Sequence, residues 1–557
     1  MTKLFCVFLI CLPFGCSGGL RDIDRRVDAL MFETSAMMGA EQPPTSFATS
    51  ATSNESLTQT SPKTINPSAE LLGFEPATKL DGAEIAKSLD RAAEDLAASG
   101  EVITLNDALV WADENAKEMQ FAQYDYLSTT LSLLSELHLW GPRFFNTISS
   151  DLSADSSDGL YDTSLAVVND FSVTQKLQNG GSVSAKALTN IARDIHSVTT
   201  ENSSSSALSV SLEIPFLRGA GAVARESLIQ SKRNMVYAAR SYERFRRTFY
   251  KDIVGDYLSL VVRKQSLENA QRGVDSLRQL AKRQAALYES GRTRLYDSAD
   301  AENQALASVA RLSQSWERYR LALDRFKIRI GWPIQNTIQV VPATLGVQPP
   351  AVDVSEAVSK ALSFRLDLQN EKDRVVDTQR GVENALNSVL PEVSFTAYGT
   401  TDSDPDKPMR FGGEEIDYAA GLSVSLPLDR ETEKINVRQQ QITLERAKRR
   451  YRESRDNVAV SVRSALRNID VFQFTLDLQE RNVKIARLGL DSINADPDRV
   501  SVLDQTRAIS DLQGAQDARD SAKRDLELSI VTYLLQAGRL RVAPSGALIL
   551  PKQSQIH

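Results

Sequence analysis

Cysteine and histidine are scarce in this 557-residue chain, and long apolar runs are missing from it. All the cysteines lie within the first sixteen residues, and the histidines are far apart in sequence, at His138, His196 and His557. A Cys/His zinc cluster or a thiol nucleophile is therefore excluded from the body of the chain, and no GxSxG nucleophile motif accompanies the histidines. We expect no enzymatic activity, no metal site and no cofactor.

Two further absences limit the partners of the chain. The formal net charge is −7, which gives no sign of a nucleic-acid-binding surface. No stretch after residue 20 approaches the eighteen or more apolar residues of a membrane-spanning helix. If the chain crosses a membrane, we therefore expect it to do so with strands.

The amino terminus has the pattern of an export signal. Lys3 precedes an apolar segment, residues 4–14, that is too short to span a bilayer, and Gly15-Cys16 follows. The pattern fits either a cleaved secretory signal or a bacterial lipoprotein signal in which Cys16 is acylated. The small residue before Cys16 favours the lipoprotein, although Pro13 stands where such signals prefer leucine. A mature chain without other cysteines suits an oxidising periplasm.

The most informative feature is a unit that occurs twice. An alternating apolar/polar strand runs into a proline and is followed by a very long proline-free helix. The first copy has the strand at 208–216 and helical periodicity over 219–290, and the second has them at 420–428 and 431–493. Apolar residues recur along the first helix at spacings of three, four and seven, which predicts coiled-coil packing. The duplication indicates an elongated, built-up tube.

The segments of the chain follow this repeat. We expect a signal peptide, a partly disordered linker region, a first repeat, a connection, a second repeat and a tail, at residues 1–16, 17–100, 101–332, 333–351, 352–540 and 541–557. Short helices are predicted within the linker region at 20–37 and 80–97, with a Ser/Thr/Pro-rich stretch at 40–75 between them.

Each repeat has the same order of elements. The first is predicted to contain a helix, four strands, a long helix and a return helix, at 104–140, 143–153, 164–177, 181–192, 206–216, 219–290 and 296–330. The second is predicted to contain a helix, two strands, a long helix and a return helix, at 353–389, 392–401, 416–428, 431–493 and 499–537. Thr104 and Asp107 form a capping-box pattern, and Gly180-Gly181 marks a tight turn.

The strands have one apolar face and one small, polar face. Leu208, Val210 and Leu212 alternate with Ser209 and Ser211, and the 420–428 strand alternates in the same way. A soluble sandwich would show this pattern too, but strands of this length span a membrane when tilted, and the uncharged polar face suits a water-filled lumen. Because lipid tolerates no open sheet edge, several copies must share one barrel. The predicted fold class is an α+β membrane protein.

These features together resemble the TolC-like outer-membrane efflux proteins. The likeness is carried, in a duplicated order, by the strand ends at 211–216 and 423–428, the helix tip at 288–291 and the segment 500–504. It covers about residues 104–540. The resemblance implies a trimer in which about four strands per chain build a twelve-stranded transmembrane β-barrel, continued by an α-helical periplasmic tunnel. The four strand-like segments of the first copy depart from this pattern, and 164–192 is either an extracellular hairpin or part of the barrel.

The resemblance also implies a periplasmic gate. Family members keep the periplasmic end closed with acidic residues just past the helix tips, which correspond here to Asp297 and, in the second copy, to Ser501 and Asp504. Three copies of Asp297 and Asp504 near an axis would form a cation-attracting constriction. The alternative is that these acids only favour the start of their helices through the helix dipole.

The same tips are the expected docking site of an adaptor. They comprise Gly291 and Arg292 in the first copy, and Asp496 and Pro497 in the second. Ala495 stands where the second tip would have its glycine, so the shape of that tip is expected to differ.

The function implied is a passive exit duct in the outer membrane. It would serve a tripartite efflux or type I secretion system, with a periplasmic adaptor and an inner-membrane RND or ABC-type transporter as partners. Nothing in the sequence separates drugs, metals and proteins as cargo. The alternative function is a soluble or peripheral coiled-coil scaffold without channel activity, which explains the helices but not the export signal or the small polar strand faces.

Overall fold

The computed structural model describes residues 20–37, 101–157, 160–196, 203–403, 410–496, 500–543 and 548–549. The predicted signal peptide with Cys16, the 40–75 stretch, the 80–97 helix and Pro497 lie outside these residues. The chain divides into two units, each built from segments far apart in sequence. One, here called the strand unit, includes Asp125–Ala239 and Asn370–Glu453; the other, the helical unit, includes Arg240–Gln369 and Ser454–His557.

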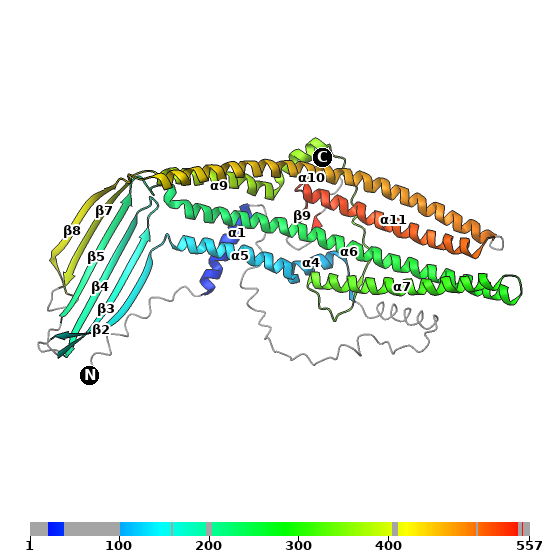
Figure 1. The fold of residues 1–557 in the computed structure, drawn as a ribbon, viewed down its shortest axis with the longest axis horizontal. Coiled ribbons are helices and arrows are strands. Elements are labelled where there is room, and N and C mark those ends of the chain that lie inside the picture. Colours follow the sequence, from blue (N-terminus) through cyan, green and yellow to red (C-terminus); the bar gives the residue numbers. More distant parts are fainter. Residues whose placement is uncertain are drawn as a thin grey trace. The chain divides into compact units, whose positions relative to one another are not determined.

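The strand unit is built on one antiparallel sheet of six strands (Figure 1). In spatial order these are β2 (Arg143–Ser157), β3 (Leu160–Lys176), β4 (Ser182–His196), β5 (Ser203–Pro215), β7 (Glu392–Ser403) and β8 (Phe411–Ser425). All six predicted strand segments are therefore confirmed. The sheet has six strands, whereas the resemblance implied about four per chain, because β3 and β4 pair with β2 and β5 in the same sheet.

The turn between β3 and β4 falls at the predicted glycine pair. Gly180 has φ 99°, a conformation that glycine adopts without strain. A Cβ atom at Gly180 would lie 2.5 Å from the carbonyl oxygen of Gly219, and one at Gly181 would lie 2.4 Å from the carbonyl oxygen of Glu213. The turn therefore requires glycine for close approach as well as for its dihedral angles.

The helix predicted at 20–37 is confirmed as α1 (Leu20–Met37). Val27 and Met31, on the predicted apolar face, are fully buried. The hydroxyl of Thr34 lies 3.6 Å from the sulfur of Met235, so this face of α1 packs against the strand unit.

The remaining helices follow the duplicated order. They are α4 (Leu105–Asn115), α5 (Lys117–His138), α6 (Glu226–Glu289), α7 (Leu295–Ile330), α8 (Val354–Phe364), α9 (Leu366–Ser388), α10 (Glu431–Ala495) and α11 (Val502–Gln536). The long and return helices are confirmed within a few residues, except that α6 begins later than predicted, after a short 3-10 turn at Val223–Arg225. Among the described residues, none of the helices combines the length and hydrophobicity needed to cross a bilayer.

Two helices predicted as continuous are each interrupted by one residue. Ala116 separates α4 from α5 with ψ 126°, and Arg365 separates α8 from α9 with ψ 118°. Neither break has a proline, so periodicity alone does not reveal it. The capping box at the start of α4 is confirmed: the Thr104 hydroxyl accepts from the amide of Asp107, whose carboxylate accepts from the amide of Thr104.

A glycine at the end of each return helix packs on each break. Gly331 ends α7 with φ 75°, and Gly538 follows α11 with φ 71°. The residue after each glycine donates to a carbonyl five residues earlier, which is the Schellman pattern. A Cβ at Gly331 would lie 2.1 Å from the carbonyl oxygen of Asn115, and one at Gly538 would lie 3.1 Å from the carbonyl carbon of Phe364. The two copies thus share one construction.

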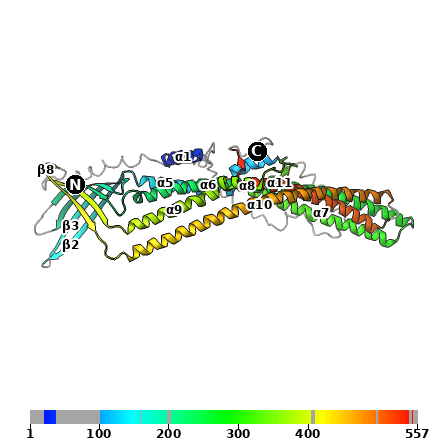
Figure 2. The ribbon, with the colours of Figure 1, turned by 90° about the horizontal axis from the view of Figure 1, so that it is seen from above.

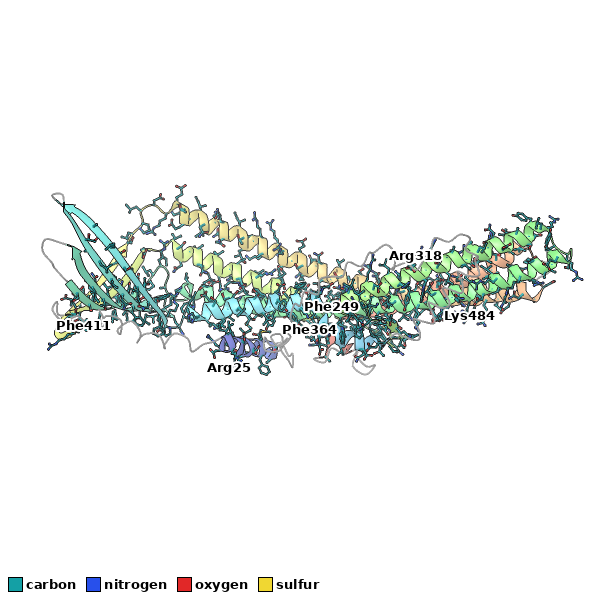
Figure 3. All side chains as sticks on the ribbon, turned by 90° about the horizontal axis from the view of Figure 1, so that it is seen from below. Arg25, Phe249, Arg318, Phe364, Phe411 and Lys484 are labelled. Carbon is teal, nitrogen blue, oxygen red and sulfur yellow. The ribbon has the colours of Figure 1, made fainter. Side chains whose placement is uncertain are left out.

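The core of the helical unit lies beside these joints. α6 supplies its largest buried side chains, among them Phe249, labelled in Figure 3, and Tyr257. The Tyr257 hydroxyl lies 2.9 Å from the carbonyl oxygens of both Ile103 and Val341. These carbonyls belong to or follow β1 (Glu101–Ile103) and β6 (Ile338–Val340), which pair in parallel. Sequence patterns missed β1 and β6, and also the small pair β9 (Arg541–Val542) and β10 (Leu548–Ile549), because strands so short have no periodicity.

Gly331→Ala is expected to lower the stability of the protein by about 2–4 kcal/mol, because the alanine must adopt a left-handed conformation and displace the backbone at Asn115. The midpoint of thermal unfolding, followed by circular dichroism, measures this loss. The matched control is Gly489→Ala, where a Cβ meets nothing within 4 Å. Equal midpoints for the two variants would contradict the close packing at the joint.

Candidate gate and docking site at the helix tips

The first tip joins α6 to α7 through a glycine turn. Gly291 has φ 73°; its amide donates to the carbonyl of Tyr288, and the amide of Arg292 donates to that of Leu287, each over 2.9 Å. This is again the Schellman pattern, which satisfies the last carbonyls of α6. Gly291 and Arg292 are both exposed. The predicted docking residues of the first copy therefore sit on a rigid, solvent-facing turn.

Asp297 lies in the first turn of α7. The N-cap residue is Arg294, so Asp297 occupies the third helical position, where the positive end of the helix dipole favours an acid. The Thr293 hydroxyl lies 3.4 Å from a carboxylate oxygen of Asp297, which is half-buried. The carboxylate is thus held close to the tip.

The second tip presents its acid in the same helical position. The N-cap of α11 is Ser501, whose hydroxyl accepts from the amide of Asp504 over 3.1 Å and donates to its carboxylate over 2.7 Å. Asp504 is therefore the third helical residue, like Asp297, and it is exposed. Asp504 therefore corresponds to Asp297 by its position in the helix, whereas Ser501 is the N-cap residue. Asp496, exposed, directly follows the last residue of α10.

A small buried cluster brings the starts of α7 and α11 together. It contains Leu277 and Leu280 of α6, Ala301 and Ala305 of α7, and Val502 of α11. Val502 directly follows the cap Ser501, so its burial fixes where the first turn of α11 lies on its neighbours. The three helices run alongside one another in both views of the helical unit (Figures 1 and 2). The tip acids are therefore carried on packed helices, not on free loops.

Comparison with known proteins identifies a family that part of this chain matches. Residues 357–527 match the family described as outer membrane efflux protein. Over these residues the chain matches the outer membrane efflux protein family. This match confirms the TolC-like resemblance over these residues, and the family is one of outer-membrane efflux channels. The family is non-enzymatic, in agreement with the expectation from the sequence.

Solved structures of outer-membrane channels and proteins share the fold. The VceC outer membrane protein of Vibrio cholerae is 14% identical, with a TM-score of 0.59 over 78% of this chain and 96% of that chain. CmeC of Campylobacter jejuni is 15% identical, with a TM-score of 0.57 over 78% and 85%. MtrE of Neisseria gonorrhoeae is 15% identical, with a TM-score of 0.57 over 78% and 89%. At these identities the likeness shows the fold alone. No curated protein matches the chain.

A half-buried carboxylate joins α6 to α11 in the helical unit. Asp517 accepts from the Ser266 hydroxyl over 3.0 Å and from the Asn269 amide over 2.7 Å. Burial raises the pKa of Asp517 above its ordinary value, and the nearby Asp520 adds to this, whereas the two donors act in the opposite direction. Sequence reasoning missed this group, because nothing in its local pattern distinguishes it from a surface acid.

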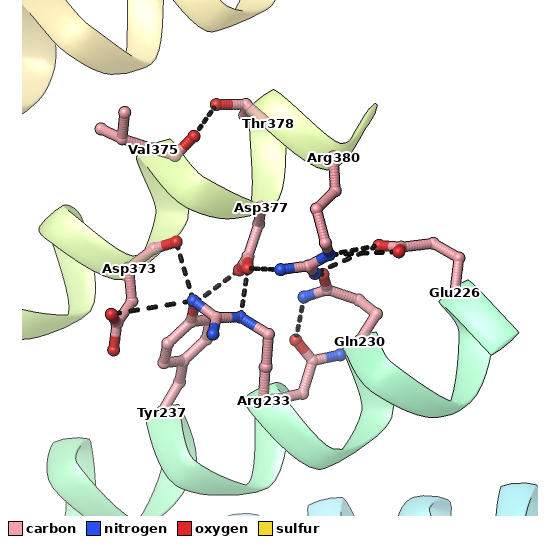
Figure 4. A network of polar contacts seen from close by, with 10 residues as sticks. Glu226, Gln230, Arg233, Tyr237, Asp373, Val375, Asp377, Thr378 and Arg380 are labelled. Carbon is pink, nitrogen blue, oxygen red and sulfur yellow. Dashed lines mark hydrogen bonds and ion pairs between the residues drawn. The ribbon is translucent and has the colours of Figure 1, made fainter. Parts of the chain in front are cut away.

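A network of polar contacts joins α6 to α9 in the strand unit (Figure 4). Asp377 accepts from Arg380 over 2.9 Å and also contacts Arg233 and the Tyr237 hydroxyl. Arg380 donates to both carboxylate oxygens of Glu226. Burial and the Asp377 carboxylate raise the pKa of Tyr237 to about 12, so its hydroxyl stays protonated and donates. The complementary spacing of acids and arginines on two helices was a signal that sequence reasoning did not use.

Asp377→Asn is expected to destabilise the protein by about 1–2 kcal/mol, because two arginines and a tyrosine lose their shared charged acceptor in a largely enclosed site. Chemical or thermal unfolding of the purified protein measures the loss. Glu445→Gln, which breaks an exposed pair with Lys448 on α10, is the control and should leave the midpoint unchanged. If both variants behave alike, the network on α6 and α9 contributes nothing beyond surface charge.

Asp517→Asn is expected to flatten the dependence of stability on pH. Because the folded-state pKa of Asp517 is raised, the folded protein takes up a proton more readily than the unfolded chain. The resulting stabilisation is complete below the unfolded-state value and disappears as the pH rises through the folded-state pKa. The difference in melting midpoint between wild type and variant, measured at several pH values from 4 to 7, should therefore shift against the wild type as pH rises. A pH-independent difference would show that Asp517 does not titrate in this way.

Proposed function

We propose that this efflux protein acts as a trimer and forms the passive exit duct of a tripartite export system. The observation that carries the proposal is the six-stranded sheet, which has one apolar face and, among the residues that the structure describes, two edges without a neighbouring strand. The family, one of trimeric outer-membrane channels, supports the same assembly. A bilayer around the apolar face and further copies at the edges would complete the sheet.

The apolar face is recognised from the register of the strands. Residues paired across an antiparallel sheet share a face, and successive residues alternate between faces. Among the sheet side chains whose exposure is described, eleven of the thirteen exposed large hydrophobic ones then share one face: Phe144, Ile148, Leu152, Phe171, Ile191, Leu208, Val210, Ile416, Tyr418, Leu422 and Val424. Only Phe145 and Tyr398 lie on the other, which is rich in serine and threonine. A face this apolar and this exposed suits contact with lipid.

The open edges argue for more than one copy. Within the described residues, β2 pairs only with β3, and β8 pairs only with β7. Their outer backbone groups would have no partner in the hydrocarbon of a membrane, where each unsatisfied group costs several kcal/mol. Closure requires β8 of one copy to pair with β2 of the next, and cyclic symmetry repeats that contact around the ring.

The proposed partners are a periplasmic adaptor and an inner-membrane transporter, and the proposed anchor is a lipid. The exposed turn at Gly291 and Arg292, with Asp496 and Pro497 at the other tip, would receive a periplasmic adaptor. The adaptor would connect the duct to an inner-membrane transporter, which supplies the energy and selects the cargo. An acyl chain on Cys16 would add a lipid anchor to each protomer.

The gate is proposed at Asp297 and Asp504. Both occupy the third position of a return helix, and both carboxylates are approached by a hydroxyl from the residues just before the helix. Ser501 then acts through Asp504, which it caps and orients, and not as a charged member of a ring. Three copies of each acid near one axis would attract cations into a narrow passage.

Planar bilayers test the duct and its gate together. The wild type is expected to conduct weakly and to be blocked by Mg²⁺ added on the periplasmic side. Neutralising the gate with Asp297→Asn and Asp504→Asn should weaken that block by roughly tenfold or more, since the charge that attracts the cation is removed. Asp511→Asn, an exposed acid further along α11, is the matched control.

Two results would contradict these proposals separately. Protein that never conducts and is recovered in the soluble fraction of cells would contradict the duct and favour a scaffold. Conduction with the same Mg²⁺ block in the Asp297/Asp504 variant and in the wild type would contradict the gate alone.

A further inference from the structure

We propose that β3 and β4 are membrane-spanning strands, and that three protomers close a barrel of eighteen strands, not twelve. The apolar side of the β3–β4 hairpin then contacts lipid, and its polar side lines the channel. This inference rests on the trimeric duct proposed above. Four observations in the strand unit carry it.

The hairpin occupies the middle of the sheet. β2 pairs with β3 from Arg143–Thr174 to Ser157–Leu160, and β4 pairs with β5 from Ser182–Glu213 to Ala192–Ser203. β2 and β5 are therefore separated by two strands, which pair with each other and with their outer neighbours. A hairpin that stood outside the wall would leave β2 and β5 to pair with each other, which they do not.

The hairpin also runs the full length of the wall. Its turn reaches the end of the sheet from which β5 leads into α6, where the amide of Gly221 donates to the carbonyl of Asn179 over 3.0 Å. The close approach of Gly180 to Gly219 and of Gly181 to Glu213 fixes it there. An extracellular loop would have no reason to return to the helices and pack on them.

The two faces of the hairpin continue those of the other strands. On the apolar face, Phe171 of β3 contacts Phe144 of β2, with ring centroids 6.5 Å apart. On the opposite face, Lys186 of β4 forms an ion pair with Asp170 of β3 over 2.9 Å. Polar residues occur on this face too, among them Asn169 and Thr189, which are paired with each other in register. The alternation is the one expected of lipid-facing and water-facing sides.

The strands are long enough to span a membrane. β3 has 17 residues and β4 has 15. At about 3.3 Å per residue and a tilt of about 40°, they cover roughly 40 Å along the membrane normal, more than the hydrocarbon thickness of about 30 Å. Neither strand would need this length as part of a surface loop.

The consequence is a wide outlet. Strands about 4.8 Å apart and tilted about 40° give a backbone diameter of about 36 Å for eighteen strands and about 24 Å for twelve. Since barrel diameter grows with strand number, the added hairpin widens the channel by about half. The membrane end of the duct would then admit bulky hydrophilic cargo, and any size selection would fall to the helical part.

Single cysteines test which side of the hairpin meets water. The native cysteines all lie within the first sixteen residues, so an added thiol is easily assigned, and the parent chain serves as the blank. Val173→Cys and Ile191→Cys place thiols on the apolar face, and Ser172→Cys and Asn190→Cys place them on the polar face, of β3 and β4 respectively. Leu422→Cys and Ser423→Cys form the matched pair on β8.

In membranes, a water-soluble maleimide should label the polar-face thiols at least tenfold faster than the apolar-face thiols on all three strands, and a lipid-soluble reagent should show the reverse order. If β8 shows this difference but both faces of β3 and β4 react equally, the hairpin lies outside the wall and the inference fails. If β8 shows no difference either, the proposed barrel itself fails.

A deletion variant tests the width. Removing Leu160–His196 takes out two strands, so β2 remains antiparallel to β5 and the chain can rejoin at one end of the sheet. Polyethylene glycols of graded size, added on the extracellular side in planar bilayers, should enter the wild-type channel up to a larger size than the variant channel. An identical size limit in a trimeric variant would overturn the inference.

Discussion

The hydrogen-bonding requirement of the strand backbone governs the architecture of this protein. Each strand inside the sheet satisfies its amide and carbonyl groups through two neighbours, whereas in the described part of the chain the two outer strands have one neighbour each. In water such an edge is tolerable, whereas in hydrocarbon it is not. Within the described residues, the sheet of one protomer is therefore left with two unpaired edges. If the sheet lies in a bilayer, as proposed, it must form one part of a closed ring.

The duplicated construction also holds the long helices in register with their neighbours. In each copy, the glycine that ends a return helix meets a one-residue break in the helix that opens the repeat. Glycine allows the backbones to touch, and the break supplies an extended residue for that contact. Polar groups such as Asp517 and Asp377 add further fixed points along α6. A long helix packed only by a uniform apolar stripe could slide by one turn, and these irregular contacts prevent it.

Much of this fold was accessible from the sequence, and the missing parts have identifiable reasons. Alternation and helical periodicity are local, so the six strands, the long helices, the capping box at Thr104 and the turn at Gly180 were predictable. The breaks at Ala116 and Arg365 were not, because they depend on glycines more than 170 residues away. The parallel pair β1–β6 is too short for periodicity. That Asp504 and Asp297 occupy equivalent helix positions could be recognised only once the N-cap of each return helix was known. The number of strands in the sheet could be recognised only once the neighbours of each strand were known.

The open sheet edges also determine how a variant chain would affect wild-type chains in the same trimer. The β2 edge comes from early in the chain and the β8 edge from late, so every seam of a closed trimer joins two different copies. A chain with one damaged edge strand would disrupt the pairing of β2 with β8 at one seam, even when the other two protomers are intact. If such a chain and the wild type were made in equal amounts and mixed at random, only about one trimer in eight would have three sound seams. Loss-of-function substitutions on β2 or β8 would therefore act as dominant ones.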